Sequence, residues 1–217
     1  MSYERERERM LSEQLCARGL RDPKVLEAMR SVPRHLFVRP TESKRAYDDT
    51  PLPIGRNQTI SQPYMVALMT EALGVTAGDK VLEVGTGSGY QAAVLGWMGA
   101  RVITVECIAE LAARARTVLG SLGLLDRVEV VESDGTLGWS AGAPYDGIVV
   151  TAGAPEIPRP LLEQLAPGGR LVLPMGEREL QTLVRLRREP EGLVEEYLGE
   201  CRFVQLSGRY GWDEPEG

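Results

Sequence analysis

Short apolar runs separated by amphipathic segments fill the middle of the chain, from residue 80 to about residue 175. The runs Val-Leu-Glu-Val, Val-Ile-Thr-Val and Gly-Ile-Val-Val are rich in β-branched residues and lack polar alternation, which is typical of strands buried on both faces. Strands are expected at 80–84, 101–106, 127–132, 145–151 and 169–174, with helices near 90–98, 109–122 and 157–166. Alternating strands and helices predict an α/β fold with a doubly wound, mostly parallel sheet.

The first 74 residues follow a different pattern, with helical spacing and loops that contain proline. A helix is predicted over 7–18, and the pair Asp22-Pro23 has the form of a helix N-cap followed by proline at the first helical position. The Glu-Arg run at 4–9 is expected to form a solvated helix face with pairs three residues apart, such as Glu4 and Arg7. These segments predict an N-terminal helical extension.

Residues 40–60 contain three prolines and Gly55, and they are predicted to form neither a helix nor the interior of a strand. A loop of this length inside a compact domain is often functional. Ser61, with proline two residues later, has the pattern of a helix N-cap. Residues 180–206 again have the pattern of strands. We expect a single domain over 1–217, with a helical and loop subregion at 1–74, an α/β core at 75–175, and C-terminal strands and a tail at 176–217.

The segment from Leu82 to Tyr90 closes the first strand of the core and opens a helix, with glycine at 85, 87 and 89. Glycines let the backbone turn sharply and let a ligand approach without meeting a Cβ atom. The helix N-terminus beyond them offers free N–H groups that suit a carboxylate. A dinucleotide-binding loop has the spacing G-x-G-x-x-G, whereas position 90 is tyrosine here. By itself the loop is also compatible with a tight strand-to-helix turn that binds no ligand.

Two acidic residues follow the next two strands, at the edge of the sheet where ligands bind in such folds. Glu106 stands at a strand end where an acidic side chain can accept two hydrogen bonds from a ribose diol. Asp134 can accept the exocyclic amine of an adenine, with room for the ring at Gly135. The segments lack a P-loop lysine or an arginine cluster, which favours an adenosine ligand without phosphates. Taken singly, each acid is also compatible with a solvated strand end or a turn.

The segment from Glu83 to Gly89 resembles the first motif of class I S-adenosylmethionine-dependent methyltransferases, and the wider chain is similar to the protein-L-isoaspartate O-methyltransferases. The segments that carry the second resemblance are 32–38, 52–55, 58–65, 82–91, 144–151 and 167–174. Gln-Thr-Ile-Ser-Gln-Pro-Tyr-Met at 58–65 is specific to this family, whereas the glycine loop and Pro-Gly-Gly are shared by many methyltransferases.

This resemblance implies a Rossmann-like fold, a reaction and roles for individual residues. The cofactor is S-adenosylmethionine, with S-adenosylhomocysteine as its product. The reaction methylates the free α-carboxyl of L-isoaspartyl residues in age-damaged proteins and peptides, and repair proceeds through a succinimide. The implied catalytic residue is Ser61, the implied cofactor-binding residues are Glu83, Gly85, Thr86, Gly87, Glu106, Asp134 and Gly135, and the implied substrate-binding residues are Ile54, Gly55, Thr59 and Ile60.

Two positions depart from the pattern of the family. Gln205 stands where the family has proline, at the expected C-terminal wall of the substrate site. The tail from Ser207 to Gly217 has no counterpart in the resemblance, so the sequence assigns it no role.

The implied chemistry requires no strong general base. The nucleophile is a carboxylate whose ordinary pKa near ~4 leaves it ionised at pH 7, and the methyl group is activated by the sulfonium of the cofactor. The protein must align oxygen, methyl and sulfur, and positioning alone can contribute ~7–11 kcal/mol. Ser61 is therefore interpreted as a hydrogen-bond donor that orients the carboxylate, with a structural role as a helix N-cap as the alternative.

Composition and charge limit the kinds of partner that we expect for this protein. Lys and Arg number 25 and Asp and Glu number 31, so the net charge of −6 provides no field that attracts nucleic acid. The three cysteines are too few for a disulfide framework and fit a reducing cytosol. The sequence has no metal-ligand spacing, no apolar signal segment and no apolar run near the ~18 residues of a membrane span. We expect a cytoplasmic monomer without a metal ion, a nucleic-acid partner or a membrane.

Three other functions stay open on the sequence alone. A class I methyltransferase can act on a small molecule or RNA, although segment 58–65 and, for RNA, the net charge oppose this. A nicotinamide dehydrogenase is opposed by Tyr90 in place of the third glycine. A non-catalytic domain that binds S-adenosylmethionine is opposed by the joint presence of the glycine loop, Glu106, Asp134 and Ser61.

Overall fold

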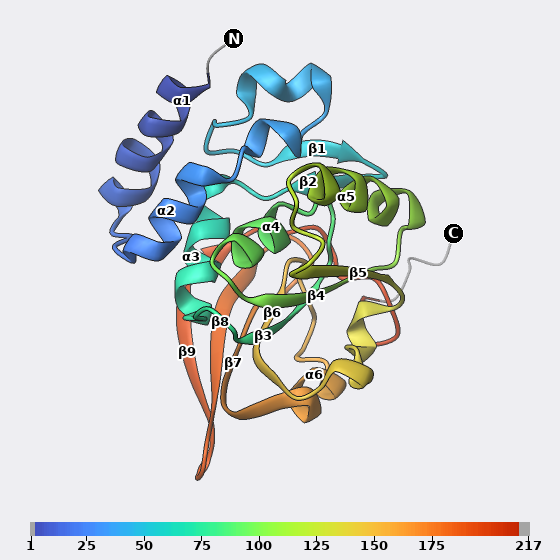
Figure 1. Cartoon of the computed structure of the whole chain (residues 1–217). Coiled ribbons are helices and arrows are strands. Elements are labelled where there is room, and N and C mark those ends of the chain that lie inside the picture. The colour runs from blue at the N-terminus through green and yellow to red at the C-terminus, as the bar shows by residue number, and fades with distance from the viewer. Residues whose placement is uncertain (1–2, 213–217) are drawn as a thin grey trace.

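A seven-stranded sheet forms the centre of the molecule in the computed structural model, which describes residues 3–212 (Figure 1). The strands lie in the order β5 (Val128–Glu132), β4 (Arg101–Glu106), β3 (Lys80–Val84), β6 (Tyr145–Val150), β7 (Leu165–Gly176), β8 (Gln181–Glu189) and β9 (Gly192–Cys201). The pairs from β5 to β7 are parallel, and the pairs of β8 with β7 and with β9 are antiparallel. The predicted doubly wound, mostly parallel α/β sheet with C-terminal strands is therefore confirmed.

Side chains of the central strands alternate between two buried apolar clusters, because neighbouring residues of a strand point to opposite faces. Val81 belongs to one cluster, and Leu82 belongs to the other together with Leu161 of α6 (Arg159–Gln164). The helices that complete the first cluster are α2 (Pro23–Ser31), α3 (Pro63–Leu73), α4 (Tyr90–Trp97) and α5 (Ala109–Ser121). Burial on both faces explains why the strands lack polar alternation.

The N-terminal segment is helical throughout, but its hydrogen-bond pattern changes twice. It consists of α1 (Glu4–Arg9), a π-helical stretch (Met10–Leu15) and a 3₁₀ turn (Cys16–Arg18). The predicted helix over 7–18 is confirmed as helical, although its middle is not a regular α-helix. Asp22 caps α2 as predicted, since its Oδ1 accepts from the backbone N–H of Lys24 at 2.8 Å.

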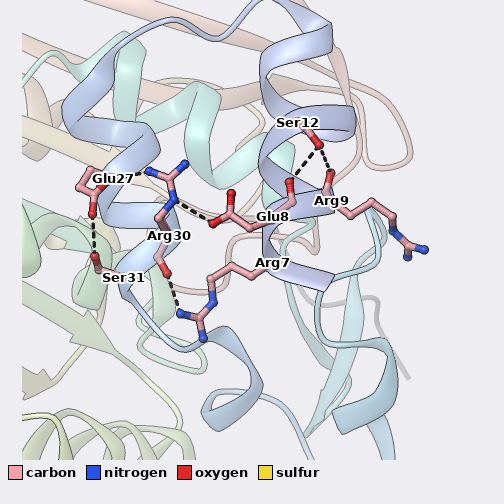
Figure 2. Close-up of polar contacts among 7 residues, drawn as sticks. All are labelled: Arg7, Glu8, Arg9, Ser12, Glu27, Arg30 and Ser31. Atoms are coloured by element: carbon pink, nitrogen blue, oxygen red, sulfur yellow. Dashed lines mark hydrogen bonds and ion pairs between the residues drawn. The ribbon is translucent and has the colours of Figure 1, made fainter. Parts of the chain in front are cut away.

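Polar contacts fasten α1 to α2, as Figure 2 shows. Arg30 Nε donates to Glu8 Oε1 at 2.9 Å, and Arg7 Nη1 donates to the carbonyl oxygen of Arg30 at 2.8 Å. Arg7 Nη2 also donates to the hydroxyl of Tyr47 at 3.2 Å. The predicted pairing of Glu4 with Arg7 is therefore wrong, because the guanidinium of Arg7 turns toward α2 and the loop instead.

Residues 40–60 contain regular structure, contrary to the prediction. Pro40–Arg45 form a 3₁₀ helix, and β1 (Leu52–Gly55) pairs antiparallel with β2 (Gln58–Ile60). Arg56 and Asn57 between these strands have φ of 54° and 57°, as in a two-residue hairpin turn of type I′. The prolines are compatible with this arrangement because they stand at a helix start and in a two-stranded ribbon with free edges.

Short 3₁₀ turns occupy Arg34–Leu36, Gly135–Leu137 and Ser140–Gly142. Within residues 3–212, no helix combines the length and the apolar character that a membrane span requires. The same residues include no group of three or more His, Cys, Asp and Glu side chains placed to hold a metal ion.

Candidate active site

Three adjoining cavities open at the C-terminal ends of β3, β4 and β6, where the strand order of the sheet reverses. We name each after a charged residue that lines it: the Glu106 cavity, the Glu83 cavity and the Arg202 cavity. Thr59 and Thr151 line all three, so the cavities meet at these two side chains.

Ser61 lies between the Glu83 cavity and the Arg202 cavity, since it lines both. The prediction that Ser61 caps helix α3 is wrong, because Gln62 occupies the N-cap position. Asp49 instead supplies the cap from outside the helix, where its Oδ1 accepts from the backbone N–H of Tyr64 at 3.1 Å. The hydroxyl of Ser61 bonds no other described residue, which leaves it available to a ligand in either cavity.

Glu83 is a buried carboxylate without a partner. It is the penultimate residue of β3, 1% of its surface is exposed, and neither carboxylate oxygen has a hydrogen bond within the described part of the chain. Burial raises the pKa of Glu83 to about 8; the nearby Thr104 hydroxyl lowers this pKa, and the charge of Glu106 raises it. Because an isolated buried charge is costly, and because no Lys or Arg lines the Glu83 cavity, the site fits a ligand that brings its own positive charge.

Glu106 braces the glycine loop and still has capacity to bind a ligand. Its Oε2 accepts from the backbone N–H of Gly87 at 2.7 Å, and its Oε1 accepts from the N–H of Ile108 at 3.0 Å. The thiol of Cys107 also donates to Oε1, at 3.8 Å. A carboxylate has about four lone-pair sites, so one site remains, on Oε2. Because the side chain lines the cavity, this site suits a hydroxyl group of a ribose.

Two glycines in the wall of the Glu106 cavity have no space for a side chain. Gly85 has φ of 93°, and a Cβ atom there would lie 2.6 Å from Thr151 Oγ1. A Cβ atom on Gly135 would lie 2.7 Å from Val84 Cγ1, so a larger residue would displace its surroundings. Thr86 is buried and lines the Glu83 cavity, where its hydroxyl is 2.7 Å from that of Thr104.

Asp134 stands beside the Glu106 cavity and holds two segments together. Its Oδ1 accepts from the backbone N–H and the hydroxyl of Thr136, at 2.9 and 2.7 Å, and its Oδ2 accepts from the N–H of Arg209 at 2.8 Å. Ser207 lines the same cavity, so the start of the tail forms one of its walls. The rest of the tail, residues 213–217, lies outside the described residues.

Two of the four predicted substrate-binding residues line the cavities and two do not. Thr59 and Ile60 line the Glu83 cavity, and Thr59 also lines the Arg202 cavity. Ile54 and Gly55 lie in β1, outside the walls of these three cavities. Gln205 lines the Glu106 cavity rather than the Arg202 cavity beside Ser61.

Sequence patterns missed several residues that build the site. Thr151 donates from its hydroxyl to the carbonyl oxygen of Gly85 at 2.5 Å, and its position directly after β6 is the signal that could have identified it. Arg202 is exposed and is the one charged residue that lines the Arg202 cavity. No local pattern points to Asp49, because the helix that it caps begins 14 residues later in the sequence.

Comparisons with known proteins agree with the geometry. The family described as Protein-L-isoaspartate(D-aspartate) O-methyltransferase (PCMT) matches residues 5–211. A protein-L-isoaspartate O-methyltransferase of Geobacter metallireducens is 54% identical over 217 residues, which are 100% of both chains. One of Methanoregula boonei is 55% identical over 208 residues, covering 96% of this chain and 95% of that protein.

Solved structures extend the similarity to the fold. A protein-L-isoaspartate O-methyltransferase with 30% identity has a TM-score of 0.84 and matches 94% of this chain and 67% of its own. A structure described as a putative enzyme of this name from Plasmodium falciparum, in complex with S-adenosyl-L-homocysteine, is 26% identical, has a TM-score of 0.79 and matches 93% of this chain and 98% of its own. With relatives this similar over its full length, the chain belongs to the protein-L-isoaspartate O-methyltransferase family.

Proposed function

We propose that Ser61 orients the substrate carboxylate while Glu83 and Glu106 hold the methyl donor. The reaction itself follows from membership in the family. The enzyme transfers a methyl group from S-adenosylmethionine to the free α-carboxyl of L-isoaspartyl residues in damaged proteins, which initiates their repair. The observation that carries the assignment of roles is the place of Ser61, on the wall shared by the Glu83 cavity and the Arg202 cavity.

The residues of the two cofactor-side cavities fit S-adenosylmethionine. The unpartnered carboxylate of Glu83 suits the ammonium group of its methionine part, and Glu106 suits a hydroxyl group of its ribose. The missing side chain at Gly135 leaves room for the adenine ring, with Asp134 beside it. Gly85, Thr86 and Gly87 form the turn that separates the two cavities. When bound, this cofactor supplies a methyl group already activated by a sulfonium.

The chain then has to position one oxygen atom and exclude water. The hydroxyl of Ser61 donates a hydrogen bond to the isoaspartyl carboxylate, which is ionised at pH 7 because its ordinary pKa is near ~4. Thr59 and Ile60 form the adjoining wall, with Ile54 and Gly55 of the hairpin behind them. We assign Glu83 to the ammonium group of the cofactor rather than to bracing the glycine loop, because its carboxylate oxygens make no hydrogen bond to that loop. No proton transfer is needed before the methyl group moves.

We also propose that the chain works as a single-domain monomer in the cytosol. One apolar cluster includes Met10 of the N-terminal helical segment and Cys201 of β9, which supports a single folding unit over 1–217. The cysteines at 16, 107 and 201 are all free, which suits a reducing compartment. Light scattering coupled to size exclusion tests the monomer, and one cooperative melting transition is expected of a single domain.

A matched pair of peptides tests the reaction. One peptide contains an L-isoaspartyl residue and the other an aspartyl residue in the same sequence, and both are incubated with the enzyme and S-adenosylmethionine labelled in its methyl group. Base-labile label on the isoaspartyl peptide alone supports the proposal. Equal labelling of both peptides, or label that resists base, contradicts transfer to an isoaspartyl carboxyl.

A further inference from the structure

Arg34 is a completely buried arginine that the reaction described above does not use. None of its surface is exposed, although it lies in a short 3₁₀ turn between α2 and the hairpin. Its Nε donates to the carbonyl oxygen of Ala46 and its Nη2 donates to the carbonyl oxygen of Ser61, both at 2.7 Å. The third nitrogen, Nη1, has no hydrogen-bond partner within residues 3–212, and no described carboxylate pairs with this guanidinium.

A charge in this position is costly for folding. Burial lowers the pKa of Arg34 to about 10, so the side chain keeps its charge at neutral pH. Removing a guanidinium from water costs several kcal/mol, and only two of its three nitrogens have a hydrogen-bond partner. These two backbone contacts offset part of the cost, and they also suggest what the arginine does.

The guanidinium joins the substrate side of the site to its cofactor side. Its Cζ lies 4.8 Å from the centre of the Tyr90 ring, and Tyr90 is the first residue of α4, directly after the glycine loop. Phe37 packs against the same ring with centroids 5.4 Å apart, which holds the ring in place. Arg34 thus holds the backbone of Ser61 at a fixed distance from the helix that follows the glycine loop.

We propose that Arg34 is a positioning residue that fixes the backbone of Ser61, so that the Ser61 hydroxyl meets the substrate carboxylate in line with the methyl donor. The inference rests on the role of Ser61 proposed above and adds the means by which that role is maintained. A planar group with several donors can hold two carbonyl oxygens in one geometry. Without it, the backbone at Ser61 keeps its chain connections but loses its anchor to α4.

A double-mutant cycle tests this coupling through the methylation of an isoaspartyl peptide. Arg34→Met is expected to lower kcat by about 10-fold or more, because small misplacements of a reacting group are costly. If Arg34 acts through Ser61, the double variant Arg34→Met with Ser61→Ala has nearly the same kcat as Ser61→Ala alone. Multiplication of the two single effects would show independent roles and overturn the proposal.

Stability measurements separate positioning from a structural role. The expected Arg34→Met protein melts cooperatively, below the wild-type temperature because the carbonyl oxygens of Ala46 and Ser61 lose their donor. It binds S-adenosylhomocysteine as wild type does, while kcat falls. Arg34→Lys, which keeps the charge but loses the planar group, is expected to recover little activity. Arg101→Met, at an exposed arginine that starts β4, is the matched control and is expected to change none of the three quantities: melting temperature, affinity and kcat.

The remaining outcomes are also decisive. If neither Arg34 variant binds S-adenosylhomocysteine or melts cooperatively, the residue has a structural role and the proposal is wrong. If Arg34→Met folds and keeps the wild-type kcat while Ser61→Ala loses activity, the proposal about Arg34 fails and that about Ser61 stands. If Ser61→Ala keeps full activity, the role proposed for Ser61 is wrong, and the proposal about Arg34, which rests on it, is wrong as well.

Discussion

The cofactor side and the substrate side of this site hold their side chains by different means. Glu83 and Glu106 lie at the C-terminal ends of two neighbouring parallel strands, as the penultimate residue of β3 and the last residue of β4. The register pairs Val84 with Val105, so the sheet itself places both carboxylates. Ser61 lies outside the sheet, and contacts from distant segments fix the chain around it. A side of the site built on strands is positioned by the regular geometry of the sheet, whereas the other depends on a few polar contacts.

The largest expected effect separates the two sides. Ser61→Ala removes the hydroxyl that we propose donates to the substrate carboxylate, and kcat is expected to fall by about 100-fold, as for the loss of one preorganised donor. The dissociation constant of S-adenosylhomocysteine is expected to stay within about twofold of wild type, because the cofactor-side residues are untouched. Steady-state kinetics and isothermal titration measure the two quantities. Unchanged turnover would remove Ser61 from the reaction.

The reciprocal change acts on the cofactor side. Glu83→Gln keeps the shape of the side chain but removes the charge that we propose pairs with the cofactor ammonium. The dissociation constant of S-adenosylhomocysteine is expected to rise by about 10-fold or more, in line with the ~1.5–3 kcal/mol of a hydrogen bond to a charged group. Isothermal titration at pH 8 measures it, with Glu110→Gln, at an exposed residue in the first turn of α5, as the control. Equal affinities would place the ammonium elsewhere.

Glu83 also predicts a pH dependence of the ligand-free enzyme. The unfolded chain loses the Glu83 proton near its ordinary pKa of 4.5, whereas the folded protein keeps it until about pH 8. The folded state therefore binds more protons in this window, and its stability falls as pH rises from about 4.5 to about 8. The contribution is on the order of a few kcal/mol.

Thermal melts of wild type and of Glu83→Gln between pH 5.5 and 8.5 measure this contribution. The variant lacks the titrating group, so its melting temperature is expected to fall less with rising pH and to exceed that of wild type near pH 8. Parallel curves for the two proteins would show that Glu83 titrates normally in the folded state.

A smaller effect is expected where the substrate side depends on Asp49. Asp49→Ala removes the cap of α3 at Tyr64 and the 2.7 Å ion pair with Arg18. The free energy of unfolding is expected to fall by about 1–2 kcal/mol, with a loss of kcat because α3 starts beside Ser61. Denaturant titration measures the first, and Asp48→Ala at the neighbouring residue is the control. Equal stability of the two variants would show that the contact contributes nothing.

The sequence predicted the cofactor side far better than the substrate side, for a physical reason. Strand ends and the glycine loop are local patterns, so the position of Glu106 followed from the strands alone, whereas Glu83 was identified by the resemblance to the family. The cap of α3 comes from Asp49, 15 residues before Tyr64, and no periodicity describes such a contact. Prolines concealed the hairpin at 52–60 because they usually interrupt strands.

Arg34 is another residue whose place in the structure the sequence does not indicate. Arginine is rarely found fully buried without a partner carboxylate, so nothing in a single sequence marks this residue as part of the interior. The resemblance to the family identified segment 32–38 as a match, but it supplied no reason for the arginine. Only the two carbonyl contacts and the ring of Tyr90 give one.

Thr59 and Thr151 form a partition where all three cavities meet, and in the arrangement proposed above both the donor and the peptide lie against it. A substitution that enlarges or reshapes this partition to admit a different peptide also changes the space left for the donor. Selectivity for the damaged protein is therefore easier to alter at the outer rim, near Arg202, than at the centre, where the same threonines border both the donor and the peptide.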